Sequence, residues 1–224
     1  MKLVHPKTKG FVKKIFNKLT WEIDTEQKAI YLTFDDGPTP DITSWVLKTL
    51  EAYKAKATFF CIGKNVQQYP QLFDKVLKAG HRIGNHTNNH LNLWKTTSKI
   101  YKDDILKAED ILDSYDKRDN IQKLSTPSEF HKKLFRPPYG KLKPKVVKHL
   151  IKQDYEIIMW DVLSYDWDKN TSGEQCYKNV ISNSSQGSII VFHDSLKASQ
   201  NLKYTLPKVL EYFTEKGYKF LAIS

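Results

Sequence analysis

Two kinds of apolar pattern alternate along the chain after residue 28. Short runs rich in β-branched and aromatic residues, typical of strands, occupy residues 29–34, 58–62, 82–84, 134–136, 155–160, 188–192 and 219–223. Between them, apolar residues recur at steps of three and four, which predicts helices that face a core. Gly80 and Gly217 follow two of these stripes, where helices commonly stop. The alternation predicts one α/β domain with parallel strands, as an open doubly wound sheet or a barrel.

The first 28 residues stand apart from this alternation. In a short helix, Phe11, Val12, Ile15, Phe16 and Leu19 would share one face, with lysines on the others. Such a basic amphipathic helix either packs on its own domain or makes a peripheral contact with an anionic membrane. We therefore divide the chain into an N-terminal segment, residues 1–28, and a single domain, residues 29–224.

The polar stretch from Asp113 to Lys133 is long for a connection and predicts a surface insertion. Neither a cleavable signal sequence nor an apolar run of about 20 residues, the length of a membrane helix, is visible. The expected location is the cytoplasm or the periphery of the cell envelope.

The charge of the chain is strongly positive, +11, but only three of its 36 basic residues are arginines: Arg82, Arg118 and Arg136. Reading of nucleic acid bases depends on the bidentate arginine fork, so the composition argues against a nucleic-acid partner. A lysine-rich surface favours looser attraction to anionic polymers, membranes or substrates. Two cysteines, Cys61 and Cys176, do not make a disulfide scaffold.

Polar side chains gather where the predicted strands end. They are Asp35 and Asp36 after the first, His86 and His90 after the third, Arg136 and Tyr139 after the fourth, Asp161 and Asp166 after the fifth, and His193 and Asp194 after the sixth. Parallel α/β sheets bring such positions together at their carboxyl edge. Each of these residue pairs alone is common in proteins and does not indicate a functional site. Together, two histidines and one aspartate make a three-ligand metal set with open positions, which leaves the second aspartate free as a base.

Five motifs in order, TFDDGP, HTNNH, RPPYG, DVLSYDW and VFHD, resemble those of the NodB-homology polysaccharide deacetylases, carbohydrate esterase family 4. The resemblance runs from about Ala29 to the C-terminus. It implies a distorted (β/α)7-type barrel of a single domain. It also implies that Asp36, His86 and His90 hold a divalent metal, usually Zn²⁺, with Co²⁺ as the alternative.

The same resemblance implies the remaining roles. Asp35 would be the general base and His193 the general acid; Arg136 would orient Asp35, and Asp166 would support His193. The backbone N–H of Tyr139 would stabilise the oxyanion, and Trp167 would line the acetyl pocket. Val191 occupies a position where relatives have leucine, and Leu163 one where many have a polar residue, which affects substrate contacts and not the reaction.

The expected function is a metal-dependent hydrolase that removes N-acetyl groups from sugars of the peptidoglycan or chitooligosaccharide type, by activated water. One alternative is a deacetylase or deformylase of a lipid-linked aminosugar, which a basic amphipathic N-terminus would suit. An esterase of acetylated xylan would use the same site. The alternative from another class is a non-catalytic barrel that binds anionic glycan or lipid through its lysines.

Overall fold

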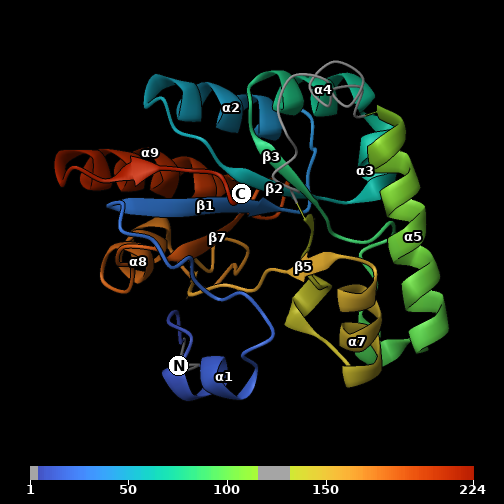
Figure 1. Cartoon of the computed structure of the whole chain (residues 1–224). Helices are drawn as coiled ribbons and strands as arrows, with labels where there is room; N and C mark the ends of the chain where they lie inside the picture. Colours follow the sequence, from blue (N-terminus) through green and yellow to red (C-terminus); the bar gives the residue numbers. More distant parts are fainter. Residues whose placement is uncertain (1–4, 116–131) are drawn as a thin grey trace.

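The computed structural model of the protein describes residues 5–115 and 132–224. Within these ranges eight parallel strands form one sheet in the order β5-β4-β3-β2-β1-β7-β6, and β8 pairs with β1 (Figure 1). The strands are β1 (Ala29–Asp35), β2 (Thr58–Cys61), β3 (Arg82–Asn85), β4 (Lys133–Phe135), β5 (Tyr155–Ile157), β6 (Val162–Leu163), β7 (Ile189–His193) and β8 (Lys219–Phe220). Each of the seven predicted runs contains a strand, which confirms the parallel α/β prediction. The two-residue strand β6 is additional.

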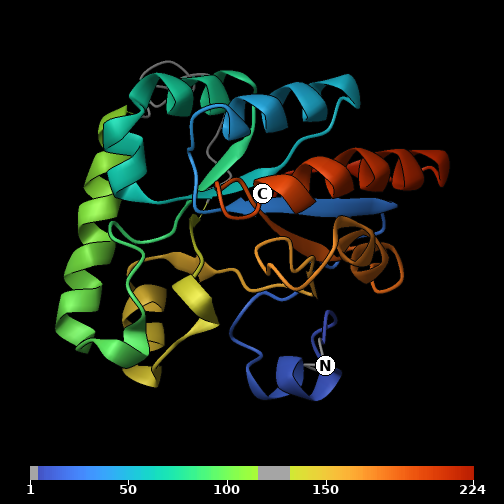
Figure 2. The ribbon, with the colours of Figure 1, turned by 180° about the vertical axis from the view of Figure 1, so that it is seen from behind.

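Helices of the described chain surround this sheet, as both views show (Figures 1 and 2). They are α1 (Gly10–Ile15), α2 (Ile42–Ala52), α3 (Gly63–Gln68), α4 (Pro70–Lys78), α5 (Ser98–Tyr115), α7 (Pro144–Lys152), α8 (Gly173–Ile181) and α9 (Ser199–Glu215), with short 3₁₀ turns η1 (Leu93–Lys95) and η2 (Pro138–Gly140). Gly80 and Gly217 have φ of 72° and 74° after α4 and α9, which confirms them as helix stops. Most of the predicted insertion, residues 116–131, lies outside the described residues.

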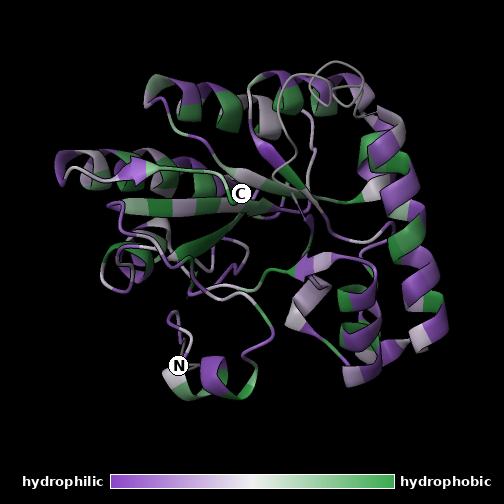
Figure 3. Ribbon diagram, in the orientation of Figure 1, coloured by the Kyte–Doolittle hydropathy of each residue, from purple (hydrophilic) through white to green (hydrophobic). Residues whose placement is uncertain are grey.

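Strand β1 is buried along its whole length and separates two apolar layers. Ile30, Leu32 and Phe34 pack under the helices, where Phe34 stacks on Phe59 at 5.0 Å. Figure 3 shows the corresponding apolar colouring of the strands. The alternate residues point the other way, since side chains of a strand alternate between its faces. Thr33 and Asp35 therefore project into the barrel interior.

The N-terminal segment lies along the two edge strands of the sheet, β5 and β6. The Thr8 N–H donates to the Asp161 carbonyl at 2.8 Å. Thr20 bridges the end of β5, because its N–H donates to the Ile157 carbonyl at 2.9 Å and its carbonyl accepts from the Met159 N–H at 2.7 Å. The barrel is thus closed by this segment where β5 and β6 do not pair with each other. The boundary at residue 28 stays a prediction.

The predicted apolar face of the N-terminal helix is divided in the structure. Val12 and Leu19 pack against the domain, while Phe11, Ile15 and Phe16 are 60%, 66% and 53% exposed. No helix in the described ranges combines the length and the apolar composition needed to cross a membrane.

Asp161 fastens the N-terminal segment to the barrel. Its buried carboxylate accepts hydrogen bonds from Lys7, Lys13 and Ser188, each at 2.6 Å. Burial alone would raise the pKa of Asp161, but the hydrogen bonds from these three residues outweigh it and lower the pKa below 3.8. Asp161 therefore stabilises the fold at neutral pH, and this contribution is lost as the pH falls through the lowered pKa.

We expect Asp161→Asn to lower the free energy of unfolding by about 1–3 kcal/mol at pH 7, because charged hydrogen bonds are lost from a buried acceptor. The Lys7 side chain is 40% exposed, so water screens its share. Denaturant titration measures the change, with the surface variant Asp110→Asn as the control. Limited proteolysis should cut earliest within residues 5–28. Equal stability of Asp161→Asn and the wild type would contradict the role of this contact.

Candidate active site

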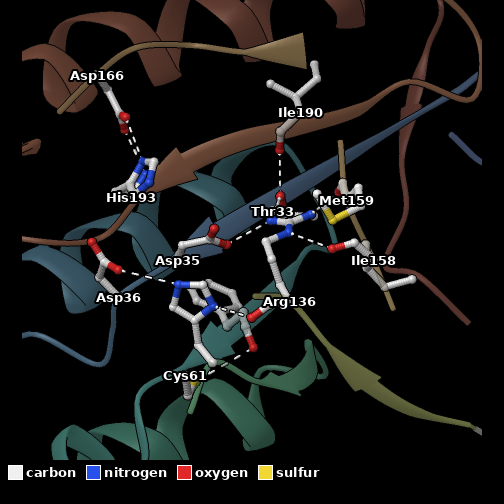
Figure 4. Close-up of polar contacts among 12 residues, drawn as sticks. Thr33, Asp35, Asp36, Cys61, Arg136, Ile158, Met159, Asp166, Ile190 and His193 are labelled. Carbon is white, nitrogen blue, oxygen red and sulfur yellow. Dashed lines mark hydrogen bonds and ion pairs between the residues drawn. The ribbon is translucent and has the colours of Figure 1, made fainter. Parts of the chain in front are cut away.

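The two adjacent carboxylates at the end of β1 face different neighbours. Asp35 ends the strand and is buried, whereas Asp36 follows in a left-handed backbone conformation, with φ of 80°. Figure 4 shows the Asp35 carboxylate directed at Arg136 and the Asp36 carboxylate directed at an imidazole. Arg136 compensates the charge of Asp35, whereas the neighbours of Asp36 are imidazoles.

The turn after these carboxylates requires glycine. A Cβ on Gly37 would lie 2.1 Å from Asp194 Oδ2. The Asp194 N–H donates to the Asp35 carbonyl at 3.1 Å, and Asp194 Oδ2 accepts from the Thr43 hydroxyl at 2.5 Å. Burial raises the pKa of Asp194 to about 8, and the Thr43 hydrogen bond opposes that shift. Asp194 thus belongs to the site as a support of the turn.

Asp36, His86 and His90 converge on one point. Asp36 Oδ1 lies 3.7 Å from His86 Nε2 and 3.2 Å from His90 Nε2. The other nitrogen of His86, Nδ1, is 2.8 Å from the Arg136 carbonyl. A carbonyl can only accept, so Nδ1 carries the proton and Nε2 keeps its lone pair. Burial lowers the pKa of His86 to about 4 and also lowers that of His90, so both rings are neutral near pH 7.

These three residues fit a divalent cation. The buried atom Asp36 Oδ1 has no hydrogen-bond partner among the described residues, and the three ligand atoms lie within 4.8 Å of one another. Ligand atoms about 2.0–2.2 Å from a shared tetrahedral ion are about 3.3–3.5 Å apart. A partnerless carboxylate oxygen facing two neutral imidazoles is costly without a cation. One carboxylate and two imidazoles also leave a coordination position open, as catalytic zinc requires.

Arg136 is completely buried and holds Asp35 in place. Its Nη1 donates to Asp35 Oδ1 at 2.7 Å, its Nη2 to the Met159 carbonyl at 2.8 Å and its Nε to the Ile158 carbonyl at 3.2 Å. Burial alone would raise the pKa of Asp35, but the charge and hydrogen bond of Arg136, with a contribution from the charge of His193, outweigh it and lower the pKa. Asp35 is therefore ionised at neutral pH and can accept a proton.

Thr33 is a contributor that sequence reasoning missed. Its hydroxyl accepts from Arg136 Nη1 at 2.6 Å and donates to the Ile190 carbonyl at 2.7 Å. The signal was a polar residue two positions before Asp35 in an apolar run, because such residues share one face of a strand. The guanidinium of Arg136 contacts the Ile158 and Met159 carbonyls on one side, and Thr33 holds it from the other side (Figure 4).

His193 and Asp166 form the second ion pair of the site. The two oxygens of Asp166 contact His193 Nδ1 at 2.8 Å and the His193 N–H at 2.7 Å. Burial would lower the pKa of His193, but the charge and hydrogen bond of Asp166, with smaller contributions from Asp36 and Asp35, raise it to about 9. Since Nδ1 is occupied, Nε2 is the nitrogen left to donate a proton.

We expect Asp166→Asn to shift the alkaline limb of the pH–rate profile to lower pH. A general acid must be protonated, so activity falls as the pH rises through its pKa. Removing the charge of Asp166 lowers the pKa of His193 from its value of about 9. Initial rates between pH 6 and about 10 measure the shift. An unmoved alkaline limb would show that His193 does not set it, and Asp168→Asn serves as the neighbouring control.

The other predicted site residues lie around these pairs. Tyr139, with φ of 59°, places its ring 4.6 Å from the His90 ring. Its backbone N–H donates none of the backbone hydrogen bonds found in the described ranges. The Trp167 ring is 4.7 Å from the His193 ring, and Val191 is buried two residues before His193 on β7. Asp36, His90 and Tyr139 all have positive φ, a strain that accumulates at functional sites.

All five strand-end segments reach the site, the fifth through Asp166, but Asp161 of that segment does not. Its carboxylate turns to Lys7 and Lys13 of the N-terminal segment. Asp166, five residues later, reaches His193 instead.

Comparison with known proteins places these features in a family. The model of the family "Polysaccharide deacetylase" matches residues 22–158, more than half of the chain. A peptidoglycan-N-acetylglucosamine deacetylase of Bacillus cereus is 35% identical over 92% of this chain and 91% of its own length. A chitooligosaccharide deacetylase of Azorhizobium caulinodans is 32% identical over 77% of this chain and 76% of its own.

Solved structures agree with the sequence relatives. The crystal structure of the Bc1960 peptidoglycan N-acetylglucosamine deacetylase superposes with a TM-score of 0.82 at 29% identity, covering 96% of this chain and 95% of that one. The structure of the peptidoglycan deacetylase PdaC from Bacillus subtilis gives 0.73 at 30% identity, covering 90% of each chain. The barrel expected from the motifs is therefore confirmed. The chain belongs to the polysaccharide deacetylases of carbohydrate esterase family 4, metal-dependent hydrolases that act on N-acetylated glycans.

Proposed function

We propose that the protein removes the N-acetyl group from amino sugars of peptidoglycan, with Zn²⁺ held by Asp36, His86 and His90. The observation that carries the proposal is the partnerless oxygen Asp36 Oδ1 facing two neutral imidazoles. Beside it lie the Asp35–Arg136 and His193–Asp166 pairs, which supply a proton acceptor and a proton donor.

The reaction needs help at both ends of an acetamide, which is a poor electrophile with a poor leaving group. The cation supplies Lewis acidity, which polarises the acetyl carbonyl and makes water acidic near neutral pH. Asp35 accepts the proton of the attacking water, and Arg136 holds its carboxylate in one orientation. His193 Nε2 donates a proton to the departing amine, while Asp166 holds the ring. The Tyr139 N–H donates to the oxyanion, and Trp167 and Val191 line the acetyl pocket.

Each polar group contributes a recognised share of the rate. A positioned acid or base typically adds about 10²–10⁴-fold, and one oxyanion donor about 10²–10³-fold. Arg136 and Asp166 act by positioning, because they touch the base and the acid and not the substrate. Their effects should appear in the pH profile and in kcat more than in KM.

The choice of peptidoglycan rests on the relatives. The Bacillus cereus and Bacillus subtilis proteins carry that substrate in their names, and the former aligns along nine-tenths of both chains. The Azorhizobium protein is named for chitooligosaccharides, which share the N-acetylglucosamine unit. Acetate release should be measured on peptidoglycan, chitooligosaccharides and acetylated xylan, after chelation and after addition of Zn²⁺ or Co²⁺.

Metal-dependent acetate release that is fastest on peptidoglycan would support the proposal. Fastest release from acetylated xylan would instead favour the esterase. No release from any substrate, with glycan binding unchanged by Asp35→Asn, would favour the non-catalytic barrel.

Membrane contact through the N-terminal helix is a separate prediction, which also bears on a lipid-linked substrate. The exposed side chains Phe11, Ile15 and Phe16 lie beside Lys14 and Lys18, a combination suited to an anionic bilayer. We expect the protein to sediment with vesicles containing anionic lipid and to lose this binding in Phe11→Ser/Phe16→Ser. The matched control is Phe11→Leu/Phe16→Leu. Equal sedimentation of all three proteins, or none, would refute the contact.

A further inference from the structure

Two loops meet beside the proposed metal site and form a ledge, which we define as residues 90–96 and 138–143. Four contacts join them. The rings of His90 and Tyr139 are 4.6 Å apart, and Trp94 Nε1 donates to the Leu142 carbonyl at 3.4 Å. Lys143 Nζ donates to the Thr96 carbonyl at 3.1 Å. Lys141 Nζ lies 3.9 Å from the centre of the Trp94 ring.

Trp94 is held firmly although its indole is exposed. All five tryptophans lie in the described part of the chain, and Trp94 alone among them is exposed, at 63%. The backbone N–H of Trp94 donates to Asn92 Oδ1 at 2.9 Å, and its neighbour Leu93 is fully buried. The Leu142 hydrogen bond and the Lys141 contact hold the exposed indole in one orientation. Indole faces suit the apolar C–H face of a sugar ring, because they are large, rigid and apolar.

The ledge is positively charged. Residues 90–96 and 138–143 contain lysines 95, 141 and 143 and no acidic residue. Among the described residues, no carboxylate pairs with Lys141, whose ammonium contacts the Trp94 ring instead. An ammonium fixed over an aromatic ring and lacking a counter-ion is suited to bind a carboxylate of a ligand.

The ledge is close enough to the site for one oligosaccharide to contact both. His90 begins one loop and is a proposed metal ligand. Leu142, which accepts the Trp94 hydrogen bond, is three residues after Tyr139, so their Cα atoms are at most about 11 Å apart. A glycan with its N-acetyl group at the metal site can therefore extend along the ledge.

We propose that Trp94 and Lys141 form a subsite for the unit next to the sugar being deacetylated, and that this subsite selects glycan strands bearing carboxylates over neutral ones. The inference rests on the proposed function and refines its substrate class. The indole stacks on the neighbouring ring, and the Lys141 ammonium pairs with the carboxylate. In peptidoglycan that carboxylate comes either from the lactyl group of muramic acid or from the peptide stem.

Three tetrasaccharides of equal length separate these contributions: neutral tetra-N-acetylchitotetraose, an alternating N-acetylglucosamine–N-acetylmuramic acid tetramer with free lactyl groups, and the same tetramer carrying peptide stems. Initial rates give kcat and KM for the wild type, Trp94→Ala, Trp94→Phe and Lys141→Gln. The exposed α5 variant Lys107→Gln is the charge control. Thermal unfolding and rates on the monosaccharide N-acetylglucosamine, which does not reach the subsite, report whether each variant is folded.

We expect Trp94→Ala to raise KM about tenfold on all three tetrasaccharides, which corresponds to about 1.4 kcal/mol of lost binding. Its kcat and its rate on the monosaccharide N-acetylglucosamine, which has no neighbouring unit, should stay unchanged, and Trp94→Phe should recover part of the loss. Lys141→Gln should abolish a wild-type preference of about fivefold or more for the carboxylate-bearing tetramers. A preference for the free lactyl tetramer, or for the peptide-bearing one, identifies the source of the carboxylate.

The inference is overturned if Trp94→Ala leaves KM within twofold, or if Lys141→Gln keeps the preference. Binding of the three tetrasaccharides to Asp35→Asn, measured by calorimetry, tests the subsite without catalysis. If no glycan releases acetate but carboxylate-bearing tetramers still bind through Trp94 and Lys141, the proposed function fails and the subsite stands.

Discussion

Asp35→Asn is expected to lower kcat by about 10²–10⁴-fold, the contribution of a positioned general base. Asparagine keeps the size of the side chain and an acceptor for Arg136, but it cannot take a proton from water. The KM should change little, because Asp35 is buried behind the metal ligands and pairs with Arg136 at 2.7 Å. Acetate release under saturating substrate measures the loss.

Asp35→Asn should also lower stability, which distinguishes it from a change at the surface. Arg136 is completely buried, and Asp35 is its charge partner within hydrogen-bond distance. Removing one charge of a buried pair typically costs about 3–5 kcal/mol, and the amide acceptor of asparagine should reduce that cost. Unfolding titrations of Asp35→Asn and Asp110→Asn check this prediction. Bound metal should stay at wild-type stoichiometry, since Asp35 is not a proposed ligand. Activity within a few-fold of wild type would remove Asp35 from the role of base.

His86→Ala is expected to have a larger effect than the loss of the base, because it removes a metal ligand. His86 is 2% exposed, and its Nδ1 is anchored to the Arg136 carbonyl, so Nε2 reaches the cluster in one orientation. Without it, Asp36 and His90 alone should not retain the ion through dialysis. We expect activity below the level of Asp35→Asn, together with loss of bound zinc measured by elemental analysis.

Chelation of the wild type provides the matching test. Activity should disappear with a chelator and return with Zn²⁺ or Co²⁺, whereas His86→Ala should not respond to either metal. His149→Ala on α7 is the control, because that histidine lies outside the cluster. Full activity of the chelated wild type, or of His86→Ala, would contradict a metal role for the cluster.

Local patterns were enough to predict the strands and the main helices. The strand β1 reads as an apolar run that ends in two aspartates, and α5 as a stripe from Tyr101 to Leu112, because burial imposes a period of two on strands and 3.6 on helices. The strand β6 was not predicted, because a run of two residues is too short to show a periodic pattern. The resemblance to a known family, and not spacing, supplied the individual roles.

Contacts between distant segments could not be predicted from local patterns. Asp161 and Asp166 looked equivalent, since both follow the fifth apolar run. The family resemblance implied that Asp166 supports His193, but only the folded chain shows that Lys7 and Lys13 pair with Asp161. The sequence also did not predict that the N-terminal segment closes the barrel. The hydrogen bonds of this segment join backbone groups, which every residue possesses.

The sequence by itself determined the parallel α/β architecture, the order of the motifs and the set of residue types able to hold a metal and move protons. The tertiary structure decided which carboxylate meets which cation, that Thr33 and two carbonyls fix Arg136, and that Trp94 lies exposed under Lys141. The physical reason is that periodicity records only whether a side chain is buried. The partner of a buried charge is set by the packing of segments far apart in the chain, as with Asp35 and Arg136, which are 101 residues apart.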